Sequence, residues 1–437
     1  MENKIRVIYD IAILGDSTVN PMYRTGIFRV IENILFEILK RDELEILLYP
    51  GRMNYRECLK YLSTSTILNH CELYLPKFYG VDMFFSRVIG RTCDIINGNK
   101  SSAGKLFWKV TVKALRILYW VYKRVSSLWE NRRKKAIFRD YNIFHASFYR
   151  VPNLAREIKS IKRFTTVFDI IPILYPYYFV NGNKHPLRKV ISRLDSHDYI
   201  FCISKATKDD LCAYTTKINP DNAFVTYLAA SDAFHVEKDE NKLYAMKKKY
   251  GIPLNCRYIL SLSTLEPRKN INLTIKSFIQ VISCNDVDDL YLVLAGAKGW
   301  KYDTILSDLD KSSRYRNRII LTGYVEDGDL APLFSGAMVF VYPSFYEGFG
   351  LPPLEAMQCG TPVITSNTSS FPEVVGDAGI MIDPNDLDGL SNNILRLYHD
   401  FSLRYELSKK SLKRAREFSW EKCADSMIAA YRKAINN

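Results

Sequence analysis

Residues 343–360 read P-S-F-Y-E-G-F-G-L-P-P-L-E-A-M-Q-C-G and lie between two β-branched segments that are typical of strands, Met338–Tyr342 and Thr361–Ser366. A loop between two such strands lies at the carboxyl end of the first, where open α/β sheets bind their ligands. Gly348 and Gly350 let the backbone approach a ligand closely and expose its N–H groups. The helix expected next begins with free amides and a partial positive charge, both of which attract phosphate. The stretch therefore predicts a phosphate-binding turn, with a purely structural strand-to-helix turn as the alternative.

Strands and helices alternate on both sides of this stretch. Expected strands are Arg257–Ser263, Leu290–Leu294 and Arg318–Leu321 in the second half, and Ile5–Ile11, Ile143–Ala146, Phe164–Phe168 and Tyr199–Ser204 in the first. Helices are expected at Phe28–Leu39, Leu273–Ile282 and Pro353–Gln358. Such alternation predicts an α/β protein with a doubly wound parallel sheet in each half.

The polar stretch Ser231–Lys249 separates the two halves and is interpreted as a linker. We therefore predict one Rossmann-like domain over residues 1–235 and a second over residues 236–420. A last helix over residues 421–437 lies far from any strand in the sequence, so it could pack back on the first domain.

The composition is that of a globular protein of two or three domains, with 437 residues of which 47% are hydrophobic. Its nine cysteines are scattered, and no pair has C-x-x-C spacing. This pattern argues against a disulfide framework or a zinc site and favours a reducing compartment. Because no secretory signal precedes the first strand, we expect a cytoplasmic protein.

Charged residues fall at two of the predicted strand ends. Glu347 lies in the turn that contains Gly348 and Gly350, called the glycine turn below, and Glu355 follows after seven intervening residues, inside the next helix. Their carboxylates are suited to accept hydrogen bonds from sugar hydroxyls. The alternative is that both are solvated acids on the surface with no ligand. Arg268 and Lys269 follow the strand Arg257–Ser263 and could neutralise a leaving diphosphate. Taken alone, however, such a pair is usually a solvated turn.

The spacing of these glutamates in E-G-F-G-L-P-P-L-E-A-M-Q-C-G-T-P-V-I resembles the motif of glycosyltransferase family 4. The segments Leu265–Asn270, Leu321–Val325 and Ser366–Gly379 continue the resemblance, which is strong over about residues 257–380 and looser over residues 1–230. It implies the GT-B fold, two Rossmann-like domains facing across a cleft. It also implies a retaining transferase that takes a sugar from a nucleotide-sugar donor.

The resemblance implies roles for individual residues. Glu347, Lys269, Arg268 and His145 would stabilise the reacting sugar and its diphosphate, and Glu355 would hold the donor ribose. The other implied donor-site residues are Gly348, Phe349, Gly350, Leu351, Gly26, Val325 and Ser263. Asp169 and Ser204 are expected on the acceptor side, although Phe168 stands where many relatives have histidine.

The resemblance implies transfer of a hexosyl group, with mannose as the favoured sugar. The acceptor would be a hydroxyl of a glycan or lipid-linked oligosaccharide in surface polysaccharide synthesis. The L-E-P-R-K-N segment favours GDP-mannose, and UDP-linked sugars stay open. The pattern Asp286-Val287-Asp288 precedes a strand, at the sheet edge opposite the ligand, so we interpret it as a polar turn. No metal and no cofactor are therefore expected.

Three alternatives stay open at this point. A sugar phosphorylase or nucleotide-sugar epimerase on the same scaffold would use a different partner. A non-catalytic membrane- or nucleic-acid-binding module would leave the donor motif unexplained, and we expect no nucleic-acid partner. A degenerate, non-catalytic subunit would keep the motif without turnover.

A basic segment carries most of the net charge of +14, since residues 85–139 hold fourteen Lys and Arg against two acids. At 100° per residue, residues 105–124 place their cations on one helix face and apolar side chains opposite. The cations are Lys105, Lys109, Lys113, Arg116, Lys123 and Arg124, and the apolar face is Phe107, Val110, Ala114, Leu115, Leu118, Val121 and Tyr122.

The cations interrupt the apolar run, so we do not expect a membrane-spanning helix. The pattern predicts that residues 105–135 lie on an anionic membrane, at the inner face of the cell membrane. The alternative is a helix packed against its own domain with one wet face.

Overall fold

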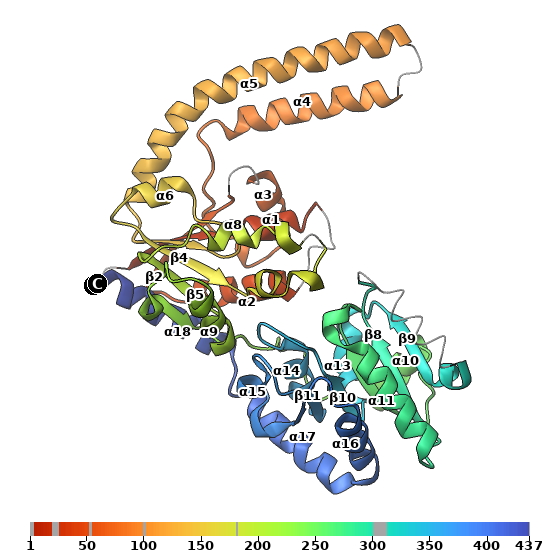
Figure 1. The fold of residues 1–437 in the computed structure, drawn as a ribbon. Coiled ribbons are helices and arrows are strands. Elements are labelled where there is room, and N and C mark those ends of the chain that lie inside the picture. The colour runs from red at the N-terminus through yellow and green to blue at the C-terminus, as the bar shows by residue number, and fades with distance from the viewer. Residues whose placement is uncertain are drawn as a thin grey trace. The chain divides into compact units, whose positions relative to one another are not determined.

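The computed structural model describes residues 4–19, 26–51, 55–98, 102–180, 182–299 and 313–436 (Figure 1). The chain divides into two compact units. One comprises Met1–Thr165, His197–Tyr199 and Tyr431–Asn437, and the other comprises Thr166–Ser196 and Ile200–Ala430.

The first sheet has six strands in the order β2-β1-β3-β4-β5-β6. The strands are β1 (Ile5–Asp10), β2 (Leu44–Tyr49), β3 (Ile143–Ala146), β4 (Lys162–Val167), β5 (Asp198–Cys202) and β6 (Ala223–Val225). The helices between them are α1 (Ala12–Asp16), α2 (Gly26–Leu39), α3 (Tyr55–Ser63), α4 (Tyr79–Gly98), α5 (Ser102–Arg139), α6 (Asn153–Glu157), α7 (Ile171–Leu174), α8 (Leu187–Ile191) and α9 (Lys205–Tyr214). Strands β2, β1, β3 and β4 are parallel neighbours, as are β5 and β6.

The second sheet is wholly parallel, in the order β12-β11-β10-β7-β8-β9. Its strands are β7 (Arg257–Leu262), β8 (Leu290–Ala295), β9 (Ile319–Gly323), β10 (Val339–Tyr342), β11 (Val363–Ser366) and β12 (Ile380–Ile382). Its helices are α10 (Glu240–Lys249), α11 (Ile271–Cys284), α13 (Asp327–Ser335), α14 (Leu351–Gln358), α15 (Phe371–Val374), α16 (Leu387–His399) and α17 (Phe401–Ala415). The sheet and the apolar faces of α11 and α16 share one buried core, which includes Ile259, Phe278, Val341 and Leu397.

The predicted parallel α/β architecture of both halves is therefore confirmed. The interpretation of Ser231–Lys249 as a linker is wrong at its end, because residues 240–249 form α10, capped by the Asp239 side chain. Lys249 at the end of α10 lies 2.8 Å from Glu326 and 2.6 Å from Asp329, which anchors this helix to α13. Polar composition misled here because α10 needs only a narrow buried face.

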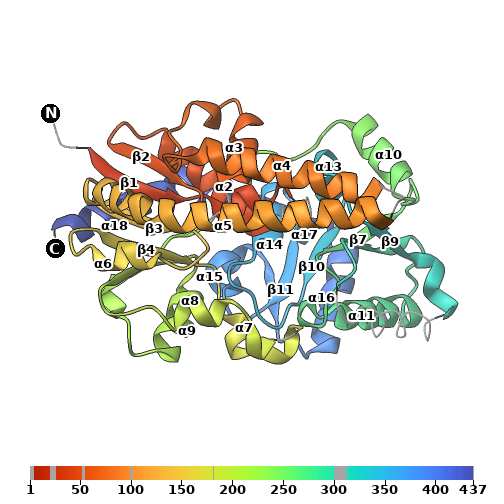
Figure 2. The same cartoon turned by 90° about the horizontal axis from the view of Figure 1, so that it is seen from above.

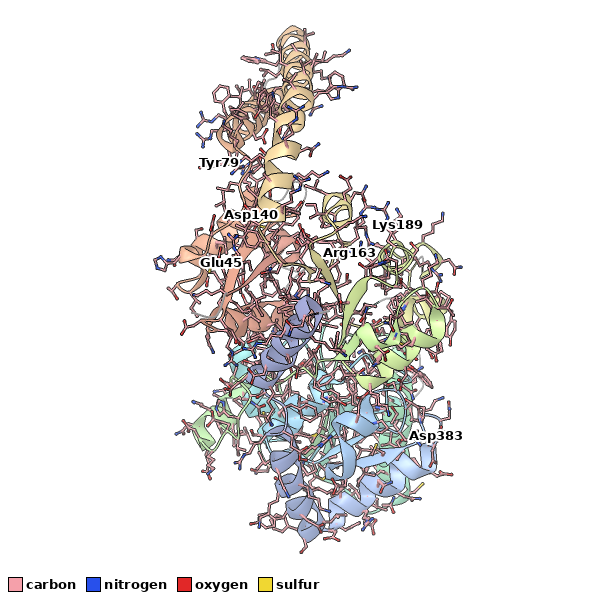
Figure 3. All side chains as sticks on the ribbon, turned by 90° about the vertical axis from the view of Figure 1, so that its left-hand side faces the viewer. Glu45, Tyr79, Asp140, Arg163, Lys189 and Asp383 are labelled. Carbon is pink, nitrogen blue, oxygen red and sulfur yellow. The ribbon has the colours of Figure 1, made fainter. Side chains whose placement is uncertain are left out.

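Helices α4 and α5 form a hairpin in the first unit and lie side by side (Figure 2). Phe85 of α4 packs its ring 5.2 Å from Tyr119 and 6.0 Å from Tyr122 of α5. Tyr79, the first residue of α4, and Asp140, directly after α5, mark the two ends of the hairpin (Figure 3). Most of the basic segment thus forms one 38-residue helix, α5, with α4 as its partner along part of its length.

The partner helix changes two details of the predicted amphipathic pattern. Tyr122, expected on the apolar outer face, is half-buried against α4. Lys123, expected among the outer cations, lies 2.6 Å from the buried carboxylate of Asp82. The side chains of Lys105 and Phe107 lie outside the described residues. None of the helices in the described ranges has an apolar stretch long enough to cross a membrane.

The last helix, α18 (Trp420–Asn436), contributes its final turns to the first unit. The ring of Tyr431 packs edge-on against Phe164 of β4, and its hydroxyl lies 2.6 Å from Nδ1 of His145. Residues 431–436 at the end of α18 are thus part of the first unit.

Candidate functional site

The glycine turn joins β10 to α14 and is fixed by backbone geometry. All four residues of β10 are buried, so the strand ends at a defined point, Tyr342. Gly350 has φ +106° and precedes the first residue of α14, and a Cβ atom there would lie 3.2 Å from the Phe371 ring. Only glycine adopts that conformation without strain, so the sequence fixes where the helix begins.

Glu347 is buried and holds both predicted cations. Its Oε1 lies 2.6 Å from Nζ of Lys269, and its Oε2 lies 2.8 Å from Nη1 of Arg268. The hydroxyl of Ser344 donates to the same Oε1 at 2.7 Å, and that of Tyr342 does so at 3.2 Å. The alternative of a solvated surface acid is therefore wrong for Glu347.

The cluster is balanced in charge. The second acid is Glu266, which lies 2.8 Å from Nη2 of Arg268 and is also buried. Burial alone would raise the pKa of Glu347, but the charges of Arg268 and Lys269 outweigh burial and hold that pKa at about 2. Glu347 is therefore ionised at neutral pH, and the two cations and two acids offset one another.

Two residues with positive φ position this cluster. Asn270 has φ +56°, and its side-chain amide donates to the carbonyl groups of Pro343 at 3.1 Å and Pro384 at 2.7 Å. Ser369 has φ +52°, and its hydroxyl accepts a hydrogen bond from the Glu347 amide at 3.0 Å. Such conformations are costly outside glycine and concentrate at functional sites.

A second loop of the same unit lies against the glycine turn. The Thr207 hydroxyl donates to the carbonyl oxygen of Gly348 at 3.2 Å. Asp169 accepts from the Ile171 amide at 2.9 Å, and burial raises the pKa of its carboxyl group. Ser204 caps α9 by accepting from the Thr207 amide, so its hydroxyl has a structural partner. The acceptor-side roles of Asp169 and Ser204 stay predictions.

Gly348→Ala is expected to lower kcat/KM at least tenfold while the protein stays folded. A Cβ atom there would lie 2.4 Å from the carbonyl oxygen of Phe168 and 3.0 Å from Cβ of Asp169, so the two loops must move apart. A displacement of about 1 Å near a reacting centre is enough for losses of order 10²-fold.

Gly328→Ala in α13 is the matched control, because a Cβ atom at Gly328 meets no atom within 4 Å. Steady-state kinetics and a thermal melt on both variants test the expectation. Equal activity of Gly348→Ala and Gly328→Ala would contradict it.

The other predicted donor-site residues of the second unit differ in how far they are buried and in the element that carries them. Phe349 and Val325 are buried, Leu351 is half-buried at the first position of α14, and Glu355 lies one turn into that helix. The buried hydroxyl of Ser263, directly after β7, has no hydrogen-bond partner among the described residues. An unsatisfied buried hydroxyl at the carboxyl end of a strand suits contact with a ligand.

His145 and Gly26 belong to the first unit. His145 is fully buried at the third position of β3, and burial lowers its pKa to about 3, so its ring is neutral at physiological pH. Gly26 is exposed at the start of α2, and no atom of the described residues lies within 4 Å of a Cβ built there. Their contacts with a donor stay predictions.

The residues that the sequence analysis missed are those that hold the cluster from outside the motif. Tyr342, Ser344, Glu266 and Ser369 contact Glu347 or its cations. Glu266 and Ser344 lie within three residues of Arg268 and Glu347 in the chain, and this nearness was the only sequence feature that could have indicated them. Ser369 comes close only through the fold, and no sequence pattern indicated it.

Residues 244–414 match the family described as glycosyl transferases group 1. The chain is 35% identical over 302 residues to the O-antigen chain mannosyltransferase B of Escherichia coli. The matched region covers 69% of this chain and 77% of that protein. It is 30% identical over 275 residues to the serotype-specific mannosyltransferase WbdA of Escherichia coli, covering 62% of this chain. The chain matches only 33% of the length of WbdA.

Among solved structures, the chain resembles HepE of Anabaena, crystallised with UDP and glucose, with a TM-score of 0.63. The superposition covers 98% of this chain and 100% of HepE, at 14% sequence identity. At that identity the likeness carries the fold alone, which is the GT-B fold that the sequence predicted.

Proposed function

Because this chain belongs to the glycosyl transferases group 1 family, we propose that it moves a hexosyl group from a nucleotide-sugar to a hydroxyl of a surface glycan, with retention at the anomeric carbon. The observation that carries the proposal is the buried cluster of Arg268, Lys269 and Glu347 beside the glycine turn. It supplies positive charge and a carboxylate in one place, at the carboxyl ends of β7 and β10.

In this mechanism the bond from the anomeric carbon to the diphosphate oxygen breaks, and a bond to the acceptor oxygen forms on the same face. The proton of the acceptor hydroxyl goes to the departing phosphate oxygen, so no side chain acts as general base. Arg268, Lys269 and the first amides of α14 stabilise the charge that develops on the diphosphate. Glu347 accepts hydrogen bonds from the transferred sugar and orients it.

The donor we propose is GDP-mannose. Support comes from the Leu265–Asn270 segment and from relatives whose names are mannosyltransferases, and the acceptor would be a glycan or lipid-linked oligosaccharide. Thermal melts with GDP-, UDP- and dTDP-linked sugars test this choice, since a ligand at a hundred times its Kd stabilises by about 2.7 kcal/mol. A shift with UDP-sugars alone would overturn the choice of donor, and no shift with any donor would overturn the donor site.

Product analysis tests the reaction itself. Nuclear magnetic resonance of the product would show the same anomeric configuration as the donor for a retaining transferase. A product formed only with inorganic phosphate as acceptor would instead identify a sugar phosphorylase.

We further propose that the reaction needs no divalent metal, because Arg268 and Lys269 already place two positive charges at the site. Activity should survive excess chelator. Loss of activity in chelator that manganese restores would contradict this.

The α4–α5 hairpin supports a peripheral site on the anionic inner face of the cell membrane. One strip of α5 exposes large apolar side chains, namely Val110, Ile117, Leu118, Val121, Val125 and Trp129. Exposed cations flank this strip, namely Lys109, Lys113, Arg116 and Arg124. An exposed apolar strip beside cations is the pattern of a helix that lies in the headgroup region.

Replacing Lys109, Lys113, Arg116 and Arg124 with glutamine is expected to weaken binding to anionic vesicles by roughly 10³-fold. Each cation near such a surface contributes about 1 kcal/mol, so four contribute about 4 kcal/mol. Co-sedimentation with phosphatidylglycerol vesicles measures the effect.

The matched control replaces four other exposed cations, Lys409, Lys410, Lys413 and Arg416, which lie on α17 and directly after it. It should bind the vesicles as the unaltered protein does. Equal losses in both variants would show that net charge, and not the hairpin, directs binding.

A further inference from the structure

A cavity of about 740 Å³ lies within the first unit, at the root of the helical hairpin. Its lining begins at Tyr49, the last residue of β2, and continues through the starts of α3, α4 and α6 and the second half of α5. Its volume falls within the range of about 300–1,000 Å³ that small-molecule sites occupy. None of the donor-site residues described above lines it.

Aromatic side chains from four separate segments line this cavity: Tyr49, Tyr55, Tyr74, Phe78 and Tyr122. The Tyr49 and Tyr74 rings lie 6.0 Å apart, and the Tyr122 hydroxyl donates to the carbonyl oxygen of Phe78 at 3.1 Å. Aromatic rings offer apolar faces with polar tips. Those faces suit the C–H surface of a sugar ring, and the tips suit its hydroxyls.

The charged groups of the lining largely offset one another. Lys123 is paired with Asp82 at 2.6 Å, and Lys135 lies 3.6 Å from Glu157. Lys134 lies over the Tyr49 ring, 4.4 Å from its centroid. Since most of the cations already have partners, the lining favours a neutral polar ligand over a phosphate, which needs cations to spare.

One acceptor atom in the lining lacks a well-aligned donor. Asp82 is only 2% exposed, and its Oδ2 accepts from Lys123. Its Oδ1 has no partner at full hydrogen-bond geometry among the described residues, although the hydroxyls of Tyr55 and Tyr119 lie close enough to interact with the carboxylate. Leaving a buried carboxylate oxygen poorly satisfied is costly. A ligand hydroxyl in the cavity would supply a well-aligned donor.

We propose that this cavity is a glycan-binding subsite that holds a neutral hexose segment of the acceptor. The identification of the ligand as acceptor rests on the proposed function, but binding of the glycan does not require the donor site. The hairpin would then serve a second purpose, since its root forms much of the wall of the subsite.

Titration of the full chain with α-linked mannotetraose and maltotetraose, without any donor, tests the subsite by calorimetry. We expect at least one of the two to bind, and Phe78→Ala to weaken that binding at least tenfold, with Phe78→Tyr restoring it. Asp82→Asn should weaken it as well. Phe78 is partly exposed, so its truncation leaves the melt unchanged even if Asp82→Asn fails to fold.

Phe84→Ala is the control, since Phe84 is an exposed aromatic of α4 outside the cavity and should leave binding unchanged. Absence of binding by both oligosaccharides would overturn the proposal, as would equal affinity of Phe78→Ala and the unaltered protein. Preferential binding of inorganic diphosphate, lost in Phe78→Ala, would overturn it too. Thermal shifts with nucleotide-sugars on the same samples report the donor site separately, so either proposal can fail alone.

Discussion

Glu347→Gln is expected to lower kcat by about 10²–10³, the usual cost of removing one group that stabilises a transition state. Glutamine keeps the shape of the side chain and one acceptor oxygen. It removes the negative charge that lies between Arg268 and Lys269 in the structure. The sugar would then bind without the carboxylate that orients it.

The same substitution should not weaken binding of the nucleoside diphosphate product. The ionised Glu347 carboxylate pairs with both cations, so a bound diphosphate must compete with it for them. Glutamine relieves that competition, so we expect the Kd of the nucleoside diphosphate to stay level or fall. Calorimetry with GDP and UDP, beside steady-state kinetics, measures the two effects separately.

Glu326→Gln provides the control, because Glu326 is an exposed acid paired with Lys249 on the surface. It should leave both kcat and Kd unchanged. A Glu347→Gln variant with kcat within threefold of the unaltered protein would remove Glu347 from the mechanism. A parallel loss of diphosphate affinity and of thermal stability would mean that Glu347 only holds the loop together.

Lys269→Met should have the opposite effect on affinity. Methionine keeps most of the side-chain length but removes the charge that would contact the diphosphate. A hydrogen bond to a charged group contributes about 1.5–3 kcal/mol, so the Kd of the nucleoside diphosphate should rise roughly 10- to 150-fold. kcat/KM should fall further, because the charge on the leaving group grows in the transition state.

Lys276→Met is the control for loss of a nearby positive charge, because Lys276 is exposed on α11, seven residues after Lys269. Its affinity for the diphosphate should equal that of the unaltered protein. If Lys269→Met binds GDP and UDP normally, the diphosphate site lies elsewhere. If Lys269→Met and Glu347→Gln change affinity in the same direction, competition between Glu347 and the diphosphate is wrong.

The sequence predicted the inner strands of the second sheet well because each is a short, mostly apolar segment rich in β-branched or aromatic residues. Met338–Tyr342 and Arg257–Ser263 match β10 and β7 to within one residue at each end. Strand β2 was not predicted, since only the charged residues 40–43 separate Leu44–Tyr49 from the preceding helix, with no glycine or proline to indicate a turn. Strands β6 and β12, with three residues each, are too short for a periodic pattern.

For the site, too, local sequence patterns predicted the residues, whereas contacts between distant parts of the chain could not be predicted. Glu347, Arg268 and Lys269 were found because the motif places each at a strand end, and the structure brings them together. That Glu347 binds both cations depends on how two loops 78 residues apart meet, which no local pattern encodes. Burial of His145 under Tyr431 likewise depends on residues 286 positions apart.

The position of Tyr431 limits when the first unit can finish folding. The first unit needs Tyr431 against His145 and Phe164, although more than two hundred residues of the other unit separate them in the chain. During translation the first unit therefore stays incomplete until α18 has left the ribosome. Its partly formed surface is exposed meanwhile, which is the stage at which chains of this size misfold or require chaperones.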